Sequence, residues 1–214
     1  MKPSYLIYDC EIIKAIPPKP NEPHYEDIDY CEGWKDFAGM GISVIGAYSS
    51  ITELHVFCAD NFHIFQGRLD QHDVIVDFNG HNFDRNLLAA NDITIDDYKH
   101  FDILRAIWKA QGLDPDEFNP RTHGGYGLDA MARANLENLT KSGNGALAPV
   151  LWQRGQVGEV IDYCLNDVHI THELFQRLLG MSGMLVNPKI PRPETNIELL
   201  DEDLDRIRDF MPRF

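Results

Sequence analysis

The stretch SYLIYDCEII, residues 4–13, decides how the chain begins to fold. Its apolar, aromatic and β-branched residues predict a buried strand, and Asp9 and Glu11 stand at its C-terminal end. Side chains two positions apart on a strand point to the same side, so these two carboxylates face the same way. Two like charges in a partly dry site repel each other unless a proton or a hard cation such as Mg²⁺ intervenes. The alternative is that the strand has already surfaced and both acids are solvated.

The whole chain has the size and composition of one soluble globular domain. Its 214 residues are 43% hydrophobic and 25% charged, which is enough to bury a sizeable core. No apolar run approaches the about 18 residues of a membrane helix. Lys2 and Pro3 lead directly into the predicted strand rather than into a signal peptide. We therefore expect a cytoplasmic protein that does not bind membranes.

The charge and the cysteines exclude several classes of protein. A formal net charge of −15 argues against strong non-specific binding to nucleic acid. Much of the acid lies in segments 21–32, 92–98 and 194–209, which leaves room for a neutral or basic groove elsewhere. The cysteines are Cys10, Cys31, Cys58 and Cys164. They form no CxxC pair, so neither a zinc site nor a disulfide framework is expected, and Cys10 and Cys164 fit small core positions.

Periodicity along the chain predicts a mixed α/β sheet. Further strands are expected at 39–50, 53–60 and 74–80, with a fifth strand or extended segment at 99–104. Helices are expected at 61–72, 82–92, 105–113, 127–136 and 155–180. Asn82 is the expected cap of the helix at 82–92, and residues 140–150 are expected to form a loop.

Two segments lie outside this pattern. Residues 14–34, rich in proline and acid, predict a long exposed loop after the first strand. After a linker at 186–193, a final helix is expected from a capping box of Thr195 and Glu198. Its apolar stripe would pack on the domain or, less favoured, on a partner protein. We thus expect a domain over 1–185 with an inserted loop at 14–36, followed by a linker and C-terminal helix over 186–214.

Two more acids stand at the ends of predicted elements. Asp84 lies in FNGHNFD, directly after the strand at 74–80. Asp167 lies on the helix at 155–180, and Tyr163, four residues earlier, shares its helix face. Each has an ordinary alternative, because an Asp at a helix start is usually a cap and a Tyr–Asp pair is often core rim and solvent. The conjunction with Asp9 and Glu11, in this order, is more specific than any single motif.

These three motifs resemble those of the DEDD exonucleases, the 3′–5′ exonucleases of the ribonuclease-H-like superfamily. In FNGHNFD, Asn79 stands five residues before Asp84 and Phe83 directly before it. This spacing is more similar to the exonuclease domains of family B DNA polymerases than to those of family A. The resemblance spans about residues 4 to 180 and implies an α/β, ribonuclease-H-like mixed five-stranded sheet flanked by helices.

The resemblance also implies a chemistry. Tyr163 marks the tyrosine subtype, because Asp162 occupies the position of the histidine in the other subtype. The implied enzyme hydrolyses phosphodiester bonds at the 3′ ends of single-stranded DNA, or less favoured RNA, and releases nucleoside 5′-monophosphates. The implied ligands of two Mg²⁺ or Mn²⁺ ions, about 3.5–4 Å apart, are Asp9, Glu11, Asp84 and Asp167. Tyr163 would orient the attacking water rather than act as a strong base, since its unperturbed pKa is about 10.

Several other residues are candidates for contact with a bound strand. By the same resemblance, Asn79 would contact the terminal nucleotide and Phe83 would pack near its base, although core packing is an equal alternative for Phe83. Lys141, Asn144 and Trp152 flank the loop before the long helix, where a phosphate contact or base stacking would be useful. A solvated lysine and a buried tryptophan are the more favoured alternatives.

Three histidines and one acid near the motifs have ordinary explanations. His169 and His172 stand three residues apart on the long helix, but no third metal ligand is evident, so surface or packing roles are favoured. His81 is expected at the rim of the site. Asp102 would either support the site from behind or, as favoured, cap the next helix.

Two alternative functions remain open. A non-catalytic module would keep the fold and dock a partner protein through the acidic loop or C-terminal helix, although four intact acids weigh against it. A nuclease that cuts internally would use the same metal site. The strong acidity is compatible with short oligonucleotides, with a strand delivered by a partner, or with weak distributive action. The sequence leaves the oligomeric state open.

Overall fold

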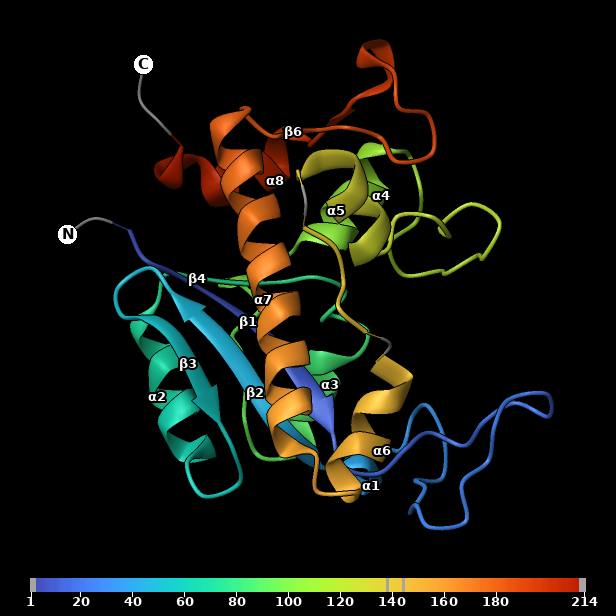
Figure 1. Cartoon of the computed structure of the whole chain (residues 1–214). Coiled ribbons are helices and arrows are strands. Elements are labelled where there is room, and N and C mark those ends of the chain that lie inside the picture. Colours follow the sequence, from blue (N-terminus) through green and yellow to red (C-terminus); the bar gives the residue numbers. More distant parts are fainter. Residues whose placement is uncertain (1–2, 138, 144, 212–214) are drawn as a thin grey trace.

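The computed structural model describes residues 3–137, 139–143 and 145–211. A five-stranded sheet in the order β3-β2-β1-β4-β5 forms its centre (Figure 1). The strands are β1 Tyr5–Ile12, β2 Ile42–Ser49, β3 Glu53–Phe57, β4 Val74–Asp77 and β5 His100–Asp102. β2 pairs antiparallel with β1 and β3, whereas β4 pairs parallel with β1 and β5. The predicted mixed five-stranded sheet is therefore confirmed, and the C-terminal ends of β1, β4 and β5 meet at one edge.

Helices cover both faces of this sheet. The helices are α1 Phe37–Met40, α2 Phe62–Gln71, α3 Asp84–Ala89, α4 Ile103–Ala110, α5 Leu128–Asn135, α6 Ala148–Gln153, α7 Val157–Gly180 and α8 Asp201–Ile207. Short 3₁₀ turns occupy Gly145–Leu147, Pro193–Thr195 and Arg208–Phe210, and a small two-stranded sheet joins β6 Met184–Leu185 to β7 Ile197–Glu198. The predicted long helix is thus α7, which runs across one face of the sheet (Figure 1).

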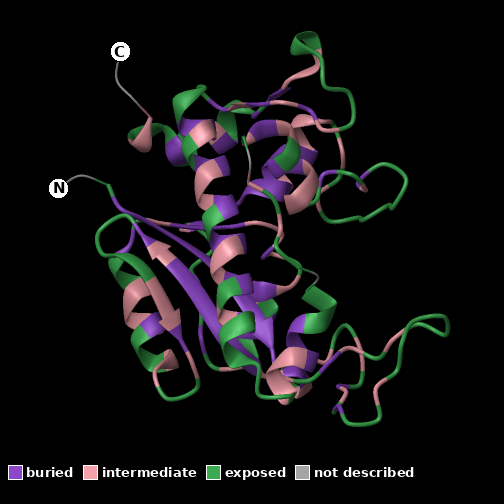
Figure 2. Cartoon of the chain, viewed as in Figure 1, coloured by how far each residue is buried: buried purple, intermediate pink, exposed green. Residues whose placement is uncertain are grey.

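β1 is buried on both faces, as its sequence predicts. Leu6, Tyr8 and Cys10 pack in a cluster with residues of α2 and α3. Tyr5 and Ile7 point the other way, into the main core that includes α4, α5 and α7. Because side chains alternate along a strand, Asp9 and Glu11 share the face that α7 covers. Figure 2 shows the central strands mostly as buried residues, whereas exposed residues gather in the loops and on parts of the helices.

Several helices and strands begin or end at residues other than those predicted. The strand expected at 74–80 ends at Asp77, and the helix expected at 82–92 is α3, Asp84–Ala89. Asn82 does not cap it, because Phe83 holds the N-cap position and no side chain caps there. α1 and α6 were not predicted, and α6 begins inside the segment expected to be a loop.

The predicted capping box of the final helix is wrong. Residues 197–198 form β7, which pairs with β6 and buries Ile197 completely. Helix α8 begins later, at Asp201, with Asp201, Glu202 and Asp203 in its first turn, where acids are favoured by the helix dipole. Pairing with a distant strand outweighed the local capping pattern.

The C-terminal segment packs on the domain, as favoured. Ile207 is fully buried in the main core, and the ring of Phe210 packs edge-on against Tyr5 with 5.6 Å between centroids. Lys109 of α4 forms ion pairs with Asp203 at 2.6 Å and Glu202 at 2.8 Å. Part of the predicted apolar stripe is therefore buried within the chain, whereas Leu200 is 42% exposed.

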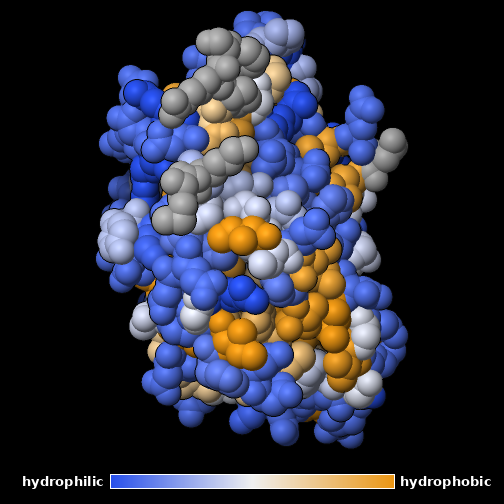
Figure 3. Space-filling view, turned by 90° about the vertical axis from the view of Figure 1, so that its left-hand side faces the viewer, coloured by the Kyte–Doolittle hydropathy of each residue, from blue (hydrophilic) through white to orange (hydrophobic). Residues whose placement is uncertain are grey.

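All the cysteines are free, and Cys10 and Cys164 are buried core residues, as predicted. Within the described ranges, no helix combines the length and hydrophobicity needed to cross a membrane. On the side of the molecule that carries β3 and α2, hydrophobic side chains gather within a hydrophilic surface (Figure 3). The exposed apolar residues of these elements and of the turn before β3 are Ile51, Leu54 and Ile64.

Candidate metal centre and active-site cleft

The strand β1 presents two carboxylates to one cavity. Asp9 and Glu11 each offer an oxygen that lies within 4.8 Å of the other's and of the Cys164 sulfur of α7. The Cys164 thiol donates to the Asp9 backbone carbonyl at 3.4 Å, which joins α7 to the end of β1. The solvated alternative is thereby excluded for Glu11, which is only 6% exposed.

The third acid reaches the same place from the neighbouring strand. Asp84 is the first residue of α3, after the loop that follows β4, and it is 7% exposed. One of its carboxylate oxygens accepts a hydrogen bond from the backbone N–H of Cys10 at 3.2 Å. Because Cys10 lies between Asp9 and Glu11, this bond ties Asp84 to the pair on β1.

The fourth acid comes from α7. Asp167 is 3% exposed and lies one turn after Tyr163 on the buried face of the helix. Its Oδ2 forms an ion pair with Lys141 Nζ at 2.6 Å, whereas its buried Oδ1 has no hydrogen-bond partner among the described residues. All four acids line one cleft of about 500 Å³. The sequence motifs therefore converge.

The surroundings of this cleft disfavour the ionised form of its acids in the absence of a cation. Burial raises the pKa of Asp9 and Glu11 well above the usual range, and the charges of the neighbouring acids add to this effect. Burial, followed by the charge of Asp77, raises the pKa of Asp84 to about 8. Burial also raises the pKa of Asp167, although Lys141 opposes it. Four crowded carboxylates, one with a bare buried oxygen, fit a centre for hard divalent cations.

Lys141 and Tyr163 stand beside Asp167. The Lys141 ammonium lies 5.3 Å from the centroid of the Tyr163 ring. Burial alone would lower the pKa of Lys141, but the charge and hydrogen bond of Asp167 raise it, so this lysine stays charged. Burial raises the pKa of Tyr163, so its hydroxyl stays protonated. Lys141 therefore lines the cleft paired with a site acid, and its contact with a phosphate stays a prediction.

The other residues that were predicted to contact a nucleic-acid strand lie in two different places. Asn79 and Phe83 line the cleft, where a nucleotide contact was predicted for them. The Phe83 ring packs edge-on against the Phe37 ring, with 5.8 Å between centroids. Trp152 of α6 is half-buried beside an apolar cluster that includes Val160, and it is not among the cleft-lining residues. Asn144 lies outside the described residues.

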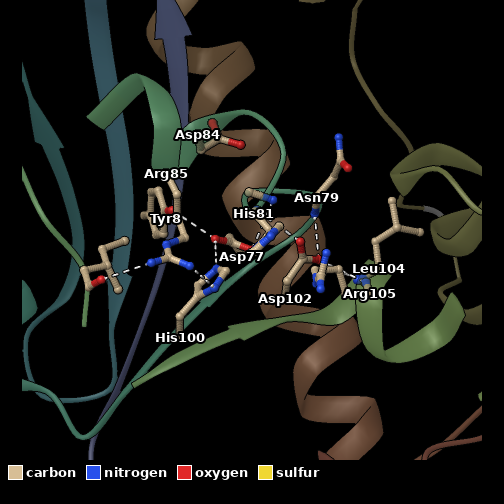
Figure 4. A network of polar contacts seen from close by, with 12 residues as sticks. Tyr8, Asp77, Asn79, His81, Asp84, Arg85, His100, Asp102, Leu104 and Arg105 are labelled. Carbon is tan, nitrogen blue, oxygen red and sulfur yellow. Dashed lines mark hydrogen bonds and ion pairs between the residues drawn. The ribbon is translucent and has the colours of Figure 1, made fainter. Parts of the chain in front are cut away.

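A buried polar network supports the loop that carries Asn79 and Asp84 (Figure 4). The Asp102 carboxylate caps α4 by accepting from Leu104 and Arg105 backbone N–H groups, which confirms the predicted cap. The same carboxylate also accepts from the N–H groups of Asn79 at 2.9 Å and His81 at 3.2 Å. Asp102 thus combines the cap with the supporting role.

Sequence reasoning missed the second half of this network. Asp77 ends β4 and accepts hydrogen bonds from the Tyr8 hydroxyl at 2.9 Å and from the Gly80 N–H at 3.2 Å. Its Oδ2 also lies 2.6 Å from Nε2 of His100. A Cβ at Gly80 would lie 2.0 Å from the Asp77 carboxylate, so this position requires glycine. The sequence did contain a signal for Asp77, because this acid directly ends the apolar run VIVD at residues 74–77.

His81, His169 and His172 occupy surface or packing positions. His81 is partly exposed beside His100 at the rim of the network. His172 packs on Tyr48 with ring centroids 4.0 Å apart, and it lies 3.3 Å from the Tyr5 hydroxyl. His169 is exposed. Glu173 lies close to both His169 and His172 and is a third potential metal ligand that the sequence analysis did not identify, but His172 is engaged in packing.

The inserted loop forms a wall of the cleft that sequence reasoning did not assign. Residues 14–36 form an irregular loop, as predicted, with an isolated β-bridge between Ala15 and Tyr30. Its cleft-lining residues are Ile16, Pro17, Lys19, Glu22 and Trp34. Beside α6, the loop extends away from the sheet (Figure 1).

Comparison with known proteins agrees with this fold and geometry. A family model described as the RNase_H superfamily matches residues 42–179. The chain belongs to the RNase H superfamily. The match runs from β2 to α7 and so includes Asp84 and Asp167, whereas Asp9 and Glu11 precede it. The resemblance stated from the motifs is confirmed at the level of the superfamily.

A solved structure shares this RNase H-like fold. It is the family B DNA polymerase of the hyperthermophilic archaeon Pyrobaculum calidifontis, with a TM-score of 0.50 and 18% sequence identity. The alignment covers 82% of this chain and 24% of the polymerase, so the chain spans about a quarter of that protein's length. At this identity the likeness concerns the fold. No curated protein sequence matches the chain.

Proposed function

We propose that this chain is a metal-dependent 3′–5′ exonuclease that removes nucleoside 5′-monophosphates from the 3′ ends of single-stranded DNA, with RNA less favoured. The observation that carries the proposal is the convergence of Asp9, Glu11, Asp84 and Asp167 in one cleft, with Tyr163 beside them. Membership of the RNase H superfamily, and the fold held in common with a DNA polymerase, support a nuclease.

Two Mg²⁺ or Mn²⁺ ions are the proposed cofactors, held by the four acids. Bound ions of this kind supply an activated water and offset charge on the phosphodiester. Asp84 is tethered through Cys10 to β1, so the two strands would present their carboxylates together. Oδ1 of Asp167, which has no hydrogen-bond partner among the described residues, is an acceptor available from the helix side.

The remaining groups of the cleft would position water and substrate. The Tyr163 hydroxyl stays protonated, so it would orient the attacking water by hydrogen bonding rather than remove its proton. Lys141 brings a positive charge next to Asp167, where charge on the phosphate would also develop. Asn79 and Phe83 line the cleft beside Asp84 and would hold the terminal nucleotide.

A degradation assay tests this function. The purified protein, incubated with Mn²⁺ and a 5′-labelled single-stranded oligonucleotide, should produce a descending ladder. Asp9→Asn should abolish the ladder, whereas the same change at the exposed Asp60, which does not line the cleft, should leave it unchanged. An intact oligonucleotide, or equal activity of Asp9→Asn and wild type, would refute the proposal. Circular single-stranded DNA should stay intact, since an exonuclease needs an end.

A further inference from the structure

Trp34 is an exposed aromatic side chain inside the cleft. Its side chain is 67% exposed, yet it lines the same cavity as the four acids. Its ring packs edge-on against Phe83, with 6.0 Å between centroids, and Phe83 directly precedes Asp84. Trp34 belongs to the inserted loop, which lies outside the motifs of the exonuclease resemblance.

The turn that carries Trp34 is well fixed. Gly33 has a φ of +145°, a conformation that side-chain-bearing residues rarely adopt. The Asp36 carboxylate accepts hydrogen bonds from the N–H groups of Glu32 at 2.8 Å and Gly39 at 3.0 Å. The Asp36 N–H in turn donates to the Gly33 carbonyl at 3.0 Å. The hydrogen bonds of this turn therefore fix the backbone that carries the Trp34 ring.

The base of the loop is anchored on α6. The Gln153 amide donates to the backbone carbonyls of Ile13 at 2.9 Å and Asp29 at 3.1 Å. Arg154 forms a two-point ion pair with Asp27, at 2.9 and 3.1 Å. These contacts keep the loop beside the cleft, so Trp34 is a standing part of its wall.

The charge of the protein makes an aromatic wall useful. With a net charge of −15, and only Lys19 and Lys141 as cations lining the described cleft, attraction for phosphates is weak. Base–aromatic stacking does not depend on charge, and every base offers a flat face. Inside a duplex both faces of a base are covered by its neighbours, so free base faces occur along an unpaired strand and at a duplex end.

On the basis of the proposed function, we propose that Trp34 stacks on a nucleobase of the bound strand. The inserted loop would then supply through stacking the affinity that the acidic surface does not supply through charge. Contact of Trp34 with an apolar group of a protein partner is the competing occupant.

A cycle of protein and substrate variants tests this proposal. Wild type, Trp34→Ala and Trp34→Phe are compared on an ordinary single strand and on one with abasic sites at its 3′-terminal positions. Trp34→Ala should raise KM on the ordinary strand about tenfold. It should have little effect on the abasic strand, where no base remains to stack. Trp34→Phe should restore most of the affinity, because a flat ring remains.

Controls separate stacking from structural damage and from the function itself. Tyr98→Ala removes another exposed aromatic, 76% exposed and away from the cleft, and should leave KM unchanged. An unchanged KM for Trp34→Ala, or an equal penalty on both strands, would overturn the proposal and leave the partner contact as the role of Trp34. Oligonucleotide binding by fluorescence anisotropy, with Ca²⁺ in place of Mn²⁺, repeats the cycle without cleavage. Tryptophan-dependent binding without any degradation would then count against the exonuclease and not against the stacking.

Discussion

In the metal-free protein, Asp84→Asn should be more stable than wild type at alkaline pH. Asp84 is buried among other acids, and these surroundings raise its pKa to about 8. Asparagine has nearly the same shape and keeps an oxygen that can accept from the Cys10 N–H, but it cannot ionise. The substitution therefore removes the charge and preserves the tether to β1.

The sign and size follow from proton linkage. A carboxyl whose pKa is raised in the folded state stabilises the fold while it is protonated, below the unfolded pKa of about 3.9, and this contribution is lost as pH rises through 8. Between pH 7 and pH 9, one group with this pKa costs about 1.4 kcal/mol of the free energy of unfolding. For a domain of this size the loss corresponds to a fall in Tm of about 3 to 6 °C.

Thermal unfolding in EDTA at pH 7 and pH 9 measures this effect. After burial, the charge of Asp84 is one of the causes that raise the pKa of Cys10 and of Asp9, so these two neighbours respond to the substitution. The buried Cys164 thiol, in contrast, is present in both proteins and cancels in the comparison. Wild type should therefore lose about 1.4 kcal/mol more than Asp84→Asn over this interval. Mn²⁺ should restore the wild type at pH 9 and have less effect on the variant, because it binds the ionised carboxylate.

Equal pH dependence of the two proteins in EDTA would refute the reasoning. It would mean that Asp84 does not titrate between pH 7 and pH 9, contrary to a pKa raised to about 8. A variant less stable than wild type at pH 9 would have the same meaning. Asp60→Asn, at an exposed acid, provides the matched control and should follow wild type at both pH values.

Three further changes test single contacts of the cleft and its support. Tyr163→Phe should lower kcat about 100-fold with Mn²⁺ affinity unchanged, by kinetics and calorimetry; an equal loss of Mn²⁺ binding would contradict a role in orienting water. Gly143→Ala places a Cβ 3.1 Å from the Tyr163 ring, so kcat should fall while the Tm stays near that of wild type; full activity would show that the ring can yield. Asp102→Ala leaves the α4 cap and the Asn79 and His81 N–H groups without their acceptor, so urea denaturation should show a loss of about 2 kcal/mol, and an unchanged midpoint would contradict the support.

Strongly periodic segments could be predicted from sequence because their own residues decide their burial. β1 alternates between two buried faces, and α7 keeps one apolar face over its length. Elements whose ends depend on distant partners could not be predicted in the same way. β7 formed where a capping box stood, because pairing with β6 buried Ile197. Local sequence contains no information about that partner.

The candidate site also has one part that local sequence predicts and one part that depends on tertiary packing. The order and spacing of its acids are written in the chain, since strand alternation puts Asp9 and Glu11 on one side and a helical turn puts Tyr163 next to Asp167. That these acids meet in one cleft depended on the packing of α7 against β1 and on the bond from Cys10 to Asp84.

The sequence by itself determined the residue types of the candidate metal centre, the strand that begins it and the helix that completes it. Only the tertiary structure decided that Lys141 pairs with Asp167, that Trp152 turns away and that Trp34 stands in the wall. The physical reason is that periodicity reports which face of an element is buried. It does not report which loop, 20 or 130 residues away in the chain, will close over that face.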